Sequence, residues 1–204
     1  MPVIRTASQA GYVTGGQRFR YVVTTVKVAP ARSVLSYAEV VLGGAGVAPV
    51  TLAVKAGGGA TAVGWSIGVP PFHMGGGTLT HVAPKAGDLV RLSLYYDQHG
   101  HVSATAVDTT RGTSQTVRLP VRAGTVYPAA EAAGVPGYTT AAPTGSTFRL
   151  WAFTGTHVTT AGGVRGTMLG PWVTSRIIQT TPRGAMVTWP SPLWSNGQNF
   201  GVWR

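Results

Sequence analysis

GDLVRLSLYYDQHGHVSATAVDTTRGTSQTVRL, residues 87–119, carries the longest unbroken two-residue alternation in this chain of 204 residues. Apolar Val90, Leu92 and Leu94 alternate with polar side chains, which is typical of a strand with one buried face. Residues 97–100 and 108–112 each hold an aspartate followed by a glycine, as hairpin turns require. The stretch therefore predicts a three-stranded antiparallel meander, whose apolar face needs a second sheet to cover it.

The composition extends this prediction to the whole chain. Charged residues make up 10% and hydrophobic residues 44%, and there are 29 glycines and 14 prolines. Such a mixture favours short strands joined by tight turns. We expect one all-β domain over residues 1–204, a two-sheet antiparallel β-sandwich of jelly-roll type.

Further strands are expected wherever apolar residues alternate between turn signals. The segment 129–133 is the best local helix candidate, and it is only a turn or two long. Residues 1–17 are expected to form an N-terminal arm, and the Trp-rich residues 190–204 to close a sheet. The remaining expected strands cover residues 18–28, 36–42, 50–55, 65–69, 148–153, 157–160, 172–180 and 185–189.

The formal net charge of +11 raises nucleic acid as a partner. However, the arginines are scattered singly along the chain and no recognition motif is present, so we do not expect nucleic-acid binding. The Gly57, Gly59 and Ala62 spacing of a dinucleotide loop is followed by no helix pattern, which argues against that function. The absence of cysteine excludes disulfides and thiolate metal sites.

We expect no resident cofactor or metal, because the five histidines and five acidic residues show no ligand spacing. The first residues lack the apolar core of a signal peptide, and no stretch reaches the ~20 apolar residues of a membrane-spanning helix. The expectation is therefore a protein made in a cytoplasm, with no membrane span.

Two glutamates are the candidate catalytic residues. Three aspartates occupy turn or strand-entry positions, but Glu39 and Glu131 each stand alone in an apolar or small-residue segment. Desolvation there disfavours the charged carboxylate and raises its pKa toward a useful range. The alternative is an exposed carboxylate facing water or an arginine. Tyr37, Trp65 and Tyr96 are candidate binding residues, since exposed aromatic rings on a sandwich can stack on sugars or enter a partner.

Several segments, in order, resemble the eqolisins, the glutamic peptidases of the G1 family. They are residues 9–30 (QAGYVTGGQRFRYVVTTVKVAP), 36–44 (SYAEVVLGG), 87–119, Ala130-Glu131, 153–158 (FTGTHV) and 190–203 (PSPLWSNGQNFGVW). The resemblance implies a concanavalin A-type sandwich, with Glu39 standing where the family has a tryptophan.

The resemblance also implies catalysis by a glutamate with a glutamine that positions water and stabilises the oxyanion. Glu131 is similar to that glutamate. The glutamine would fall near residues 51–54, where Ala53 stands, and no glutamine occurs between Gln17 and Gln98. The segment after Glu131 also lacks the family's tryptophan and second carboxylate. We therefore expect a chain that keeps the fold and has lost the peptidase activity.

Three functions follow from these observations. The first is a non-catalytic structural or binding protein, because the composition resembles that of phage minor tail and other virion proteins. It would reside in the virion, contact other virion proteins or copies of itself, and bind a host-surface glycan. The second is an acid endopeptidase with an altered dyad, in which Glu131 works with Glu39 or a backbone donor. The third is a nucleic-acid-binding sandwich with strong salt dependence.

Overall fold

The computed structural model describes residues 1–30, 35–68, 76–136 and 149–203. All fifteen of its regular elements are β-strands, as the sequence predicts. Within these residues no helix has the length and hydropathy needed to cross a membrane. The strands form one continuous hydrogen-bonded array that divides into two layers.

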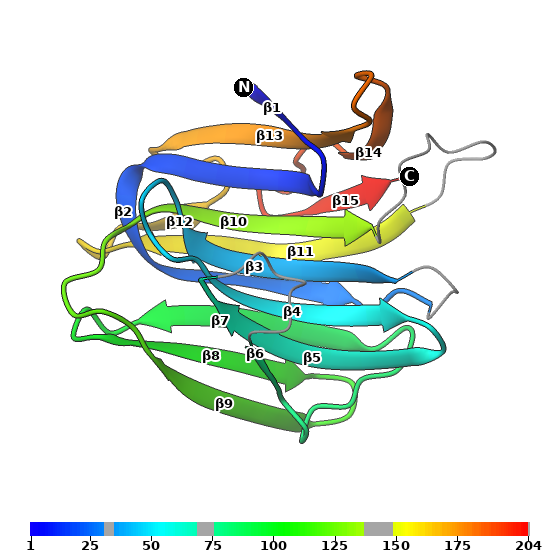
Figure 1. Ribbon diagram of the computed structural model, residues 1–204, viewed down its shortest axis with the longest axis horizontal. Coiled ribbons are helices and arrows are strands. Elements are labelled where there is room, and N and C mark those ends of the chain that lie inside the picture. The colour runs from blue at the N-terminus through cyan, green and yellow to red at the C-terminus, as the bar shows by residue number, and fades with distance from the viewer. Residues whose placement is uncertain (31–34, 69–75, 137–148, 204) are drawn as a thin grey trace.

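The first layer carries the candidate site. Its strands are stacked in Figure 1 from β13 near the top to β5 below. In hydrogen-bonded order they are β1 (Val3–Thr6), β13 (Val173–Thr180), the first half of β2 (Ala10–Lys27), β10 (Tyr127–Pro136), β3 (Ser36–Gly43), β4 (Val50–Gly57), β5 (Ala60–Ile67) and β6 (Gly76–Thr78). Among the described pairings only β1 with β13 is parallel.

The second layer contains the predicted meander. In order its strands are β14 (Met186–Pro190), β15 (Phe200–Trp203), β11 (Arg149–Thr160), the second half of β2, β7 (Leu89–Tyr96), β8 (His101–Asp108) and β9 (Thr113–Pro120), with β12 (Arg165–Thr167) beside β11. The meander is confirmed in residues and in pairing. Val90, Leu92 and Leu94 are fully buried, and Gly100 and Gly112 adopt the positive φ angles of their turns.

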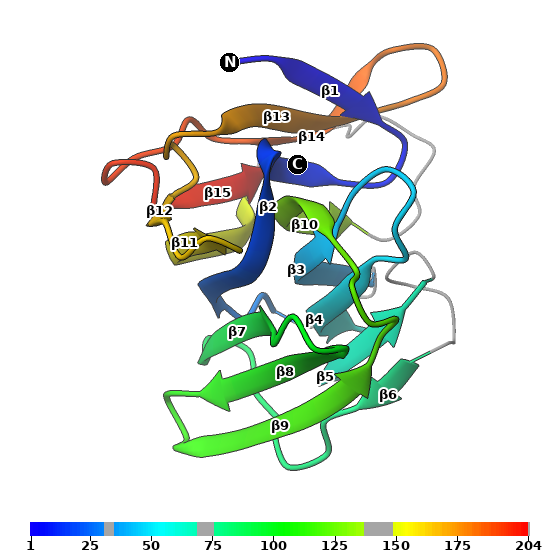
Figure 2. The same ribbon diagram turned by 90° about the vertical axis from the view of Figure 1, so that its left-hand side faces the viewer.

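Strand β2 belongs to both layers. Its residues up to Gly15 pair with β10 and β13, and its residues from Tyr21 onward pair with β11 and β7. Phe19 pairs with both β10 and β11. Gly16 lies at this change with a φ of 80°, which a glycine adopts without strain. Figure 2 shows β2 running down from the upper strands toward β7. One strand thus fixes the position of the site-bearing layer relative to the meander.

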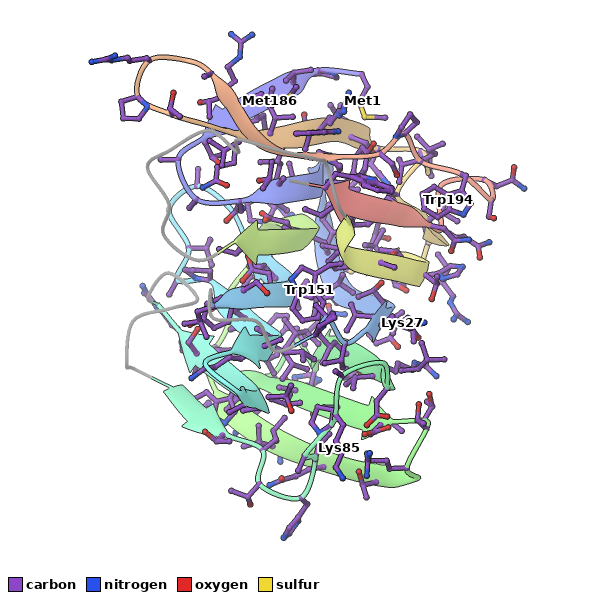
Figure 3. The ribbon with its side chains drawn as sticks, turned by 90° about the vertical axis from the view of Figure 1, so that its right-hand side faces the viewer. Met1, Lys27, Lys85, Trp151, Met186 and Trp194 are labelled. Atoms are coloured by element: carbon purple, nitrogen blue, oxygen red, sulfur yellow. The ribbon has the colours of Figure 1, made fainter. Side chains whose placement is uncertain are left out.

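The core lies between the layers and consists of their inward-facing side chains. Trp151 is 1% exposed, and Figure 3 shows it inside the molecule, while Met1, Met186 and Trp194 lie at the periphery. Phe153 stacks on Phe200 with ring centroids 4.4 Å apart. Burial of these large side chains stabilises the sandwich by about 1.5–3 kcal/mol each.

The structure differs from three sequence-based expectations. The segment expected as an arm contains β1 and the start of β2, which begins at Ala10. The two strands expected at 148–153 and 157–160 are one strand, β11. Residues 129–133, the best helix candidate, lie in β10. Because β10 lies between β2 and β3, its backbone is fully paired as a strand.

Candidate functional site

Three of the five acidic residues have structural roles in the meander. Asp97 accepts two backbone N–H groups within its hairpin turn, and Asp108 does the same in the next turn. Asp88 pairs with the guanidinium of Arg111 at 2.5 Å. These contacts agree with the turn positions predicted for the aspartates. Two carboxyl groups, those of Glu39 and Glu131, are left for acid–base chemistry.

The two glutamates lie on one face of the first layer. In the β10–β3 register Glu131 is opposite Val41, and Glu39 is opposite Ala133. Alternate residues of a strand share a face and directly opposed residues share it too, so the two carboxyl groups are diagonal neighbours. This face points away from the core, which contains the intervening Ala38, Val40, Ala130 and Ala132. The same-face condition for a two-glutamate site is therefore met.

Glu39 is a fully enclosed carboxyl group. The residue is 0% exposed, and neither carboxyl oxygen has a hydrogen-bond partner within the described part of the chain. Its cross-strand neighbours are Ala133 on β10 and Ala53 on β4, with Gly64 beyond on β5. None of these small side chains can donate a hydrogen bond. Burial raises the pKa of Glu39 well above its ordinary value, and the nearby charge of Glu131 raises it further.

Glu131 accepts a hydrogen bond from a glutamine that lies outside the region indicated by the resemblance to the eqolisins. The side-chain amide of Gln9 donates to its Oε1. Burial raises the pKa of Glu131 to about 7, while the Gln9 hydrogen bond acts in the opposite direction. An N–H donor favours the ionised carboxylate, so Glu131 is the member of the pair better suited to hold a negative charge.

Gln9 is fixed in place by the turn that precedes β2. Thr6 Oγ1 donates to the Gln9 carbonyl oxygen at 2.9 Å and accepts from the Gln9 backbone N–H at 3.1 Å. Ala7, which follows Thr6 in that turn, is also anchored, because the side-chain amide of Gln179 donates to its carbonyl oxygen. The amide that reaches Glu131 is therefore held by a hydrogen-bonded backbone and does not depend on packing alone.

Two hydroxyl groups, those of Thr51 and Ser66, lie on the same face as Glu131, further along the layer. Thr51 on β4 is opposite both Val41 and Ser66 of β5, so it shares their face with the glutamates. Thr51 is 2% and Ser66 5% exposed, and neither hydroxyl has a partner within the described residues. Buried hydroxyl groups normally find a protein or water partner. This face thus has capacity for additional hydrogen bonds beside the two carboxyl groups.

The structure separates the three predicted binding aromatics. Tyr37 lies on the site face, two residues before Glu39 and opposite Lys55. Tyr96 is 3% exposed and packs edge-on against Tyr127 in the core, so it is not part of this surface. Trp65 is opposite the buried Leu52 and packs against the core as well. Only Tyr37 is thus brought next to the glutamates.

The sequence contains a signal for Gln9 in the alternation that leads into β2. Ala10, Tyr12 and Thr14 are all buried, and this alternation extends β2 upstream of the strand expected from residue 18. Gln9 has the parity of Val13, which is opposite Glu131. The resemblance to the eqolisins indicates instead the region of β4, where Ala53 stands.

No ligand set for a metal ion emerges from the described residues, in that no three His, Asp or Glu side chains come together there. The site instead consists of an amide, two carboxyl groups and two hydroxyl groups, with Tyr37 and Lys55 on the same face.

Comparison with sequences gives no match: neither a protein-family model nor a curated protein is similar enough to this chain. Comparison with solved structures does find matches. Scytalido-glutamic peptidase bound to a transition state analog inhibitor has a TM-score of 0.73 and 17% identity, over 96% of this chain and 97% of that one.

Two further structures agree with this likeness. SCP-B, a member of the eqolisin family of peptidases in complex with the tripeptide Ala-Ile-His, has a TM-score of 0.66 and 16% identity, over 96% of this chain and 97% of that one. Aspergilloglutamic peptidase from Aspergillus niger has a TM-score of 0.58 and 16% identity, over 82% and 97%. At these identities the likeness concerns the fold, and the chain has the β-sandwich fold of the eqolisin peptidases.

Proposed function

We propose that this protein is a glutamic-type endopeptidase with an altered catalytic pair, in which Glu131 is the acid–base residue and Gln9 the amide beside it. The observation that carries the proposal is the hydrogen bond from the Gln9 side chain to Glu131. It places the two side-chain types of glutamic-peptidase chemistry in contact, on a chain with the fold of those peptidases.

The chemistry is hydrolysis of a peptide bond by an activated water. The ionised Glu131 takes a proton from the water, whose oxygen forms a bond to the scissile carbonyl carbon. The carbonyl oxygen becomes an oxyanion. Glu131 then gives its proton to the nitrogen, the C–N bond breaks, and an acid and an amine are released. No other co-reactant is needed.

Gln9 has two tasks in this scheme. One N–H of its amide donates to Glu131 and keeps the carboxylate oriented. An amide nitrogen carries a second N–H, which is available for the developing oxyanion. The resemblance to the eqolisins places the glutamine on the β4 side of Glu131, whereas Gln9 approaches from the β2 side.

This proposal replaces the expectation that the peptidase activity has been lost. That expectation depended on the missing glutamine near Ala53, and Gln9 supplies an amide from elsewhere in the chain. The described residues and the comparisons give no support to the alternative of a virion protein with a glycan ligand. Its partners and location remain predictions from composition.

The test is cleavage of a denatured protein between pH 3 and pH 8, with new chain ends identified by mass spectrometry. We expect cleavage by the wild type and none by Glu131→Gln, which keeps the side-chain size. Gln9→Leu should lose most activity, whereas Gln17→Leu, at an exposed position of β2, should not. Cleavage that is unchanged in Glu131→Gln would refute the proposal.

A further inference from the structure

The enclosed carboxyl group of Glu39 has no structural explanation. It sits in the middle of β3, is 0% exposed, and both oxygens lack partners within the described residues. A buried ionised carboxylate without a partner costs several kcal/mol, and a neutral carboxyl group costs much less. An alanine or valine would fit the strand at no such cost. Among the described residues, the acidic group that neighbours this carboxyl group is Glu131.

The charged and titratable groups around Glu39 are few. Glu131 faces it from β10, diagonally across one strand pairing. On its own strand Tyr37 is two residues away, and on β4 the exposed Lys55 is opposite Tyr37. On β5 the nearest positions of this face are Ala62, Gly64 and Ser66, which carry no charge. Among the described residues Glu131 is therefore the charge that Glu39 senses most directly.

We propose that Glu39 is the second member of a two-carboxyl site, in which Glu39 keeps a proton while Glu131 is ionised. Two neighbouring carboxyl groups in a buried site cannot both carry a charge cheaply, so they hold one proton between them. The surroundings decide which group keeps it. Gln9 donates to Glu131 and stabilises the anion there, whereas no group in the described part of the chain donates to Glu39.

In this arrangement Glu39 is a positioning residue that acts through Glu131. While Glu39 is protonated it is neutral, so it places no negative charge beside the catalytic base. Once it ionises, the two negative charges repel and the base is held less well. Glu39 thus sets the alkaline limit of activity, and Glu131 sets the acid limit. This inference rests on the proposed function for its effect on rate, but its protonation order stands without it.

Nuclear magnetic resonance can read both carboxyl groups directly, because Glu39 and Glu131 are the only glutamates in the chain. Glutamate labelled with ¹³C at the side-chain carboxyl carbon gives two titrating signals, assigned with Glu39→Gln and Glu131→Gln. We expect the Glu131 signal to titrate first, at near-neutral pH, and the Glu39 signal at higher pH. In Glu131→Gln the Glu39 midpoint should move to lower pH, since the neighbouring charge is gone.

The variant Glu39→Gln provides the decisive comparison. If Glu39 is neutral while Glu131 titrates, replacing it by a neutral amide leaves the Glu131 midpoint nearly unchanged. If Glu39 were ionised first, the same change would lower the Glu131 midpoint, and the proposal would be overturned. A Glu39 midpoint in the ordinary range of a glutamate would overturn it as well, even if Glu39→Gln failed to fold, because the wild type alone gives that value.

The effect on rate separates this inference from the proposed function. For an active protein, Glu39→Gln should remove the alkaline decline of the pH–rate profile and keep the acid limb. A purely structural role would lower the rate equally at every pH. An inactive wild type whose glutamates titrate in the predicted order would refute the peptidase and retain the two-carboxyl site. An active wild type in which Glu39 ionises before Glu131 would support the peptidase and refute the two-carboxyl site.

Discussion

Raising the pH from 4.5 to 8 should destabilise this protein, because its two glutamates have raised pKa values and hold protons that the unfolded chain releases. Burial raises the pKa of Glu131 from an ordinary 4.5 to about 7. Below pH 4.5 the carboxyl group is protonated in both states and costs nothing. As the pH rises toward 7 the unfolded chain ionises first, and each pKa unit of difference removes 1.36 kcal/mol of stability.

The expected loss is about 3 kcal/mol from Glu131 alone, from about 2.5 pKa units at 1.36 kcal/mol each. Glu39 adds to the loss in the same direction, because its pKa is also raised. Such a change is a large part of the ~5–15 kcal/mol that stabilises a typical domain. Asp97 acts in the opposite direction, since its pKa is lowered to about 2, but its contribution falls away only below its ordinary 3.8. The range above pH 4.5 therefore separates the effect of the glutamates from that of Asp97.

The assay is urea unfolding followed by tryptophan fluorescence at half-unit steps of pH. Glu131→Gln and Glu39→Gln should each remove part of the slope, and the double variant Glu39→Gln/Glu131→Gln should be nearly flat between pH 4.5 and 8. The double variant also serves as the control for pH effects that arise elsewhere in the chain. A wild-type free energy of unfolding that stays constant would refute the reasoning, as would an equal slope in the double variant.

Two further predictions concern stability. Thr51→Val should leave the free energy of unfolding unchanged or raise it by up to ~1 kcal/mol, because the buried hydroxyl has no partner within the described residues. Thr24→Val should lower it by ~1–3 kcal/mol, because it leaves the Thr156 hydroxyl, 2.8 Å away, unpaired. Gly11→Ala should destabilise the protein by more than ~2 kcal/mol, since the added Cβ would lie within 2.6 Å of the β10 backbone. Gly15→Ala in the same strand should change stability by less than ~1 kcal/mol, because the atom nearest to its added Cβ is 3.8 Å away. Chemical denaturation measures both, and a reversed order within either pair would contradict them.

The sequence predicted the meander well because its signals are local. Alternation places Leu92 and Leu94 on the buried face, and the turns hold their own aspartates. The same alternation put Tyr96 on the buried side, where the structure has it, although it was also considered as a binding residue. Period-two patterns are therefore a better guide to which side a residue faces than its chemical type.

The candidate site could be predicted only in part. Glu39 and Glu131 stand out because a lone carboxylate in a small-residue segment is rare, and the structure brings the two together. Gln9 and Glu131 are 122 residues apart, and their contact depends on the non-local pairing of β2 with β10. The sequence of the Ala-rich β10 does not indicate which strand it pairs with, because it has almost no alternation of apolar and polar residues.

Glu131 is proposed to carry out peptide hydrolysis in this sandwich. The most direct test is the rate of cleavage of an internally quenched fluorogenic peptide, taken from pH 3 to pH 9 with the wild type and with Glu131→Gln. We expect a bell-shaped profile for the wild type and a fall of ~10²–10⁴-fold in the variant at the optimum. Equal rates in the two proteins, or no cleavage by the wild type at any pH, would contradict it.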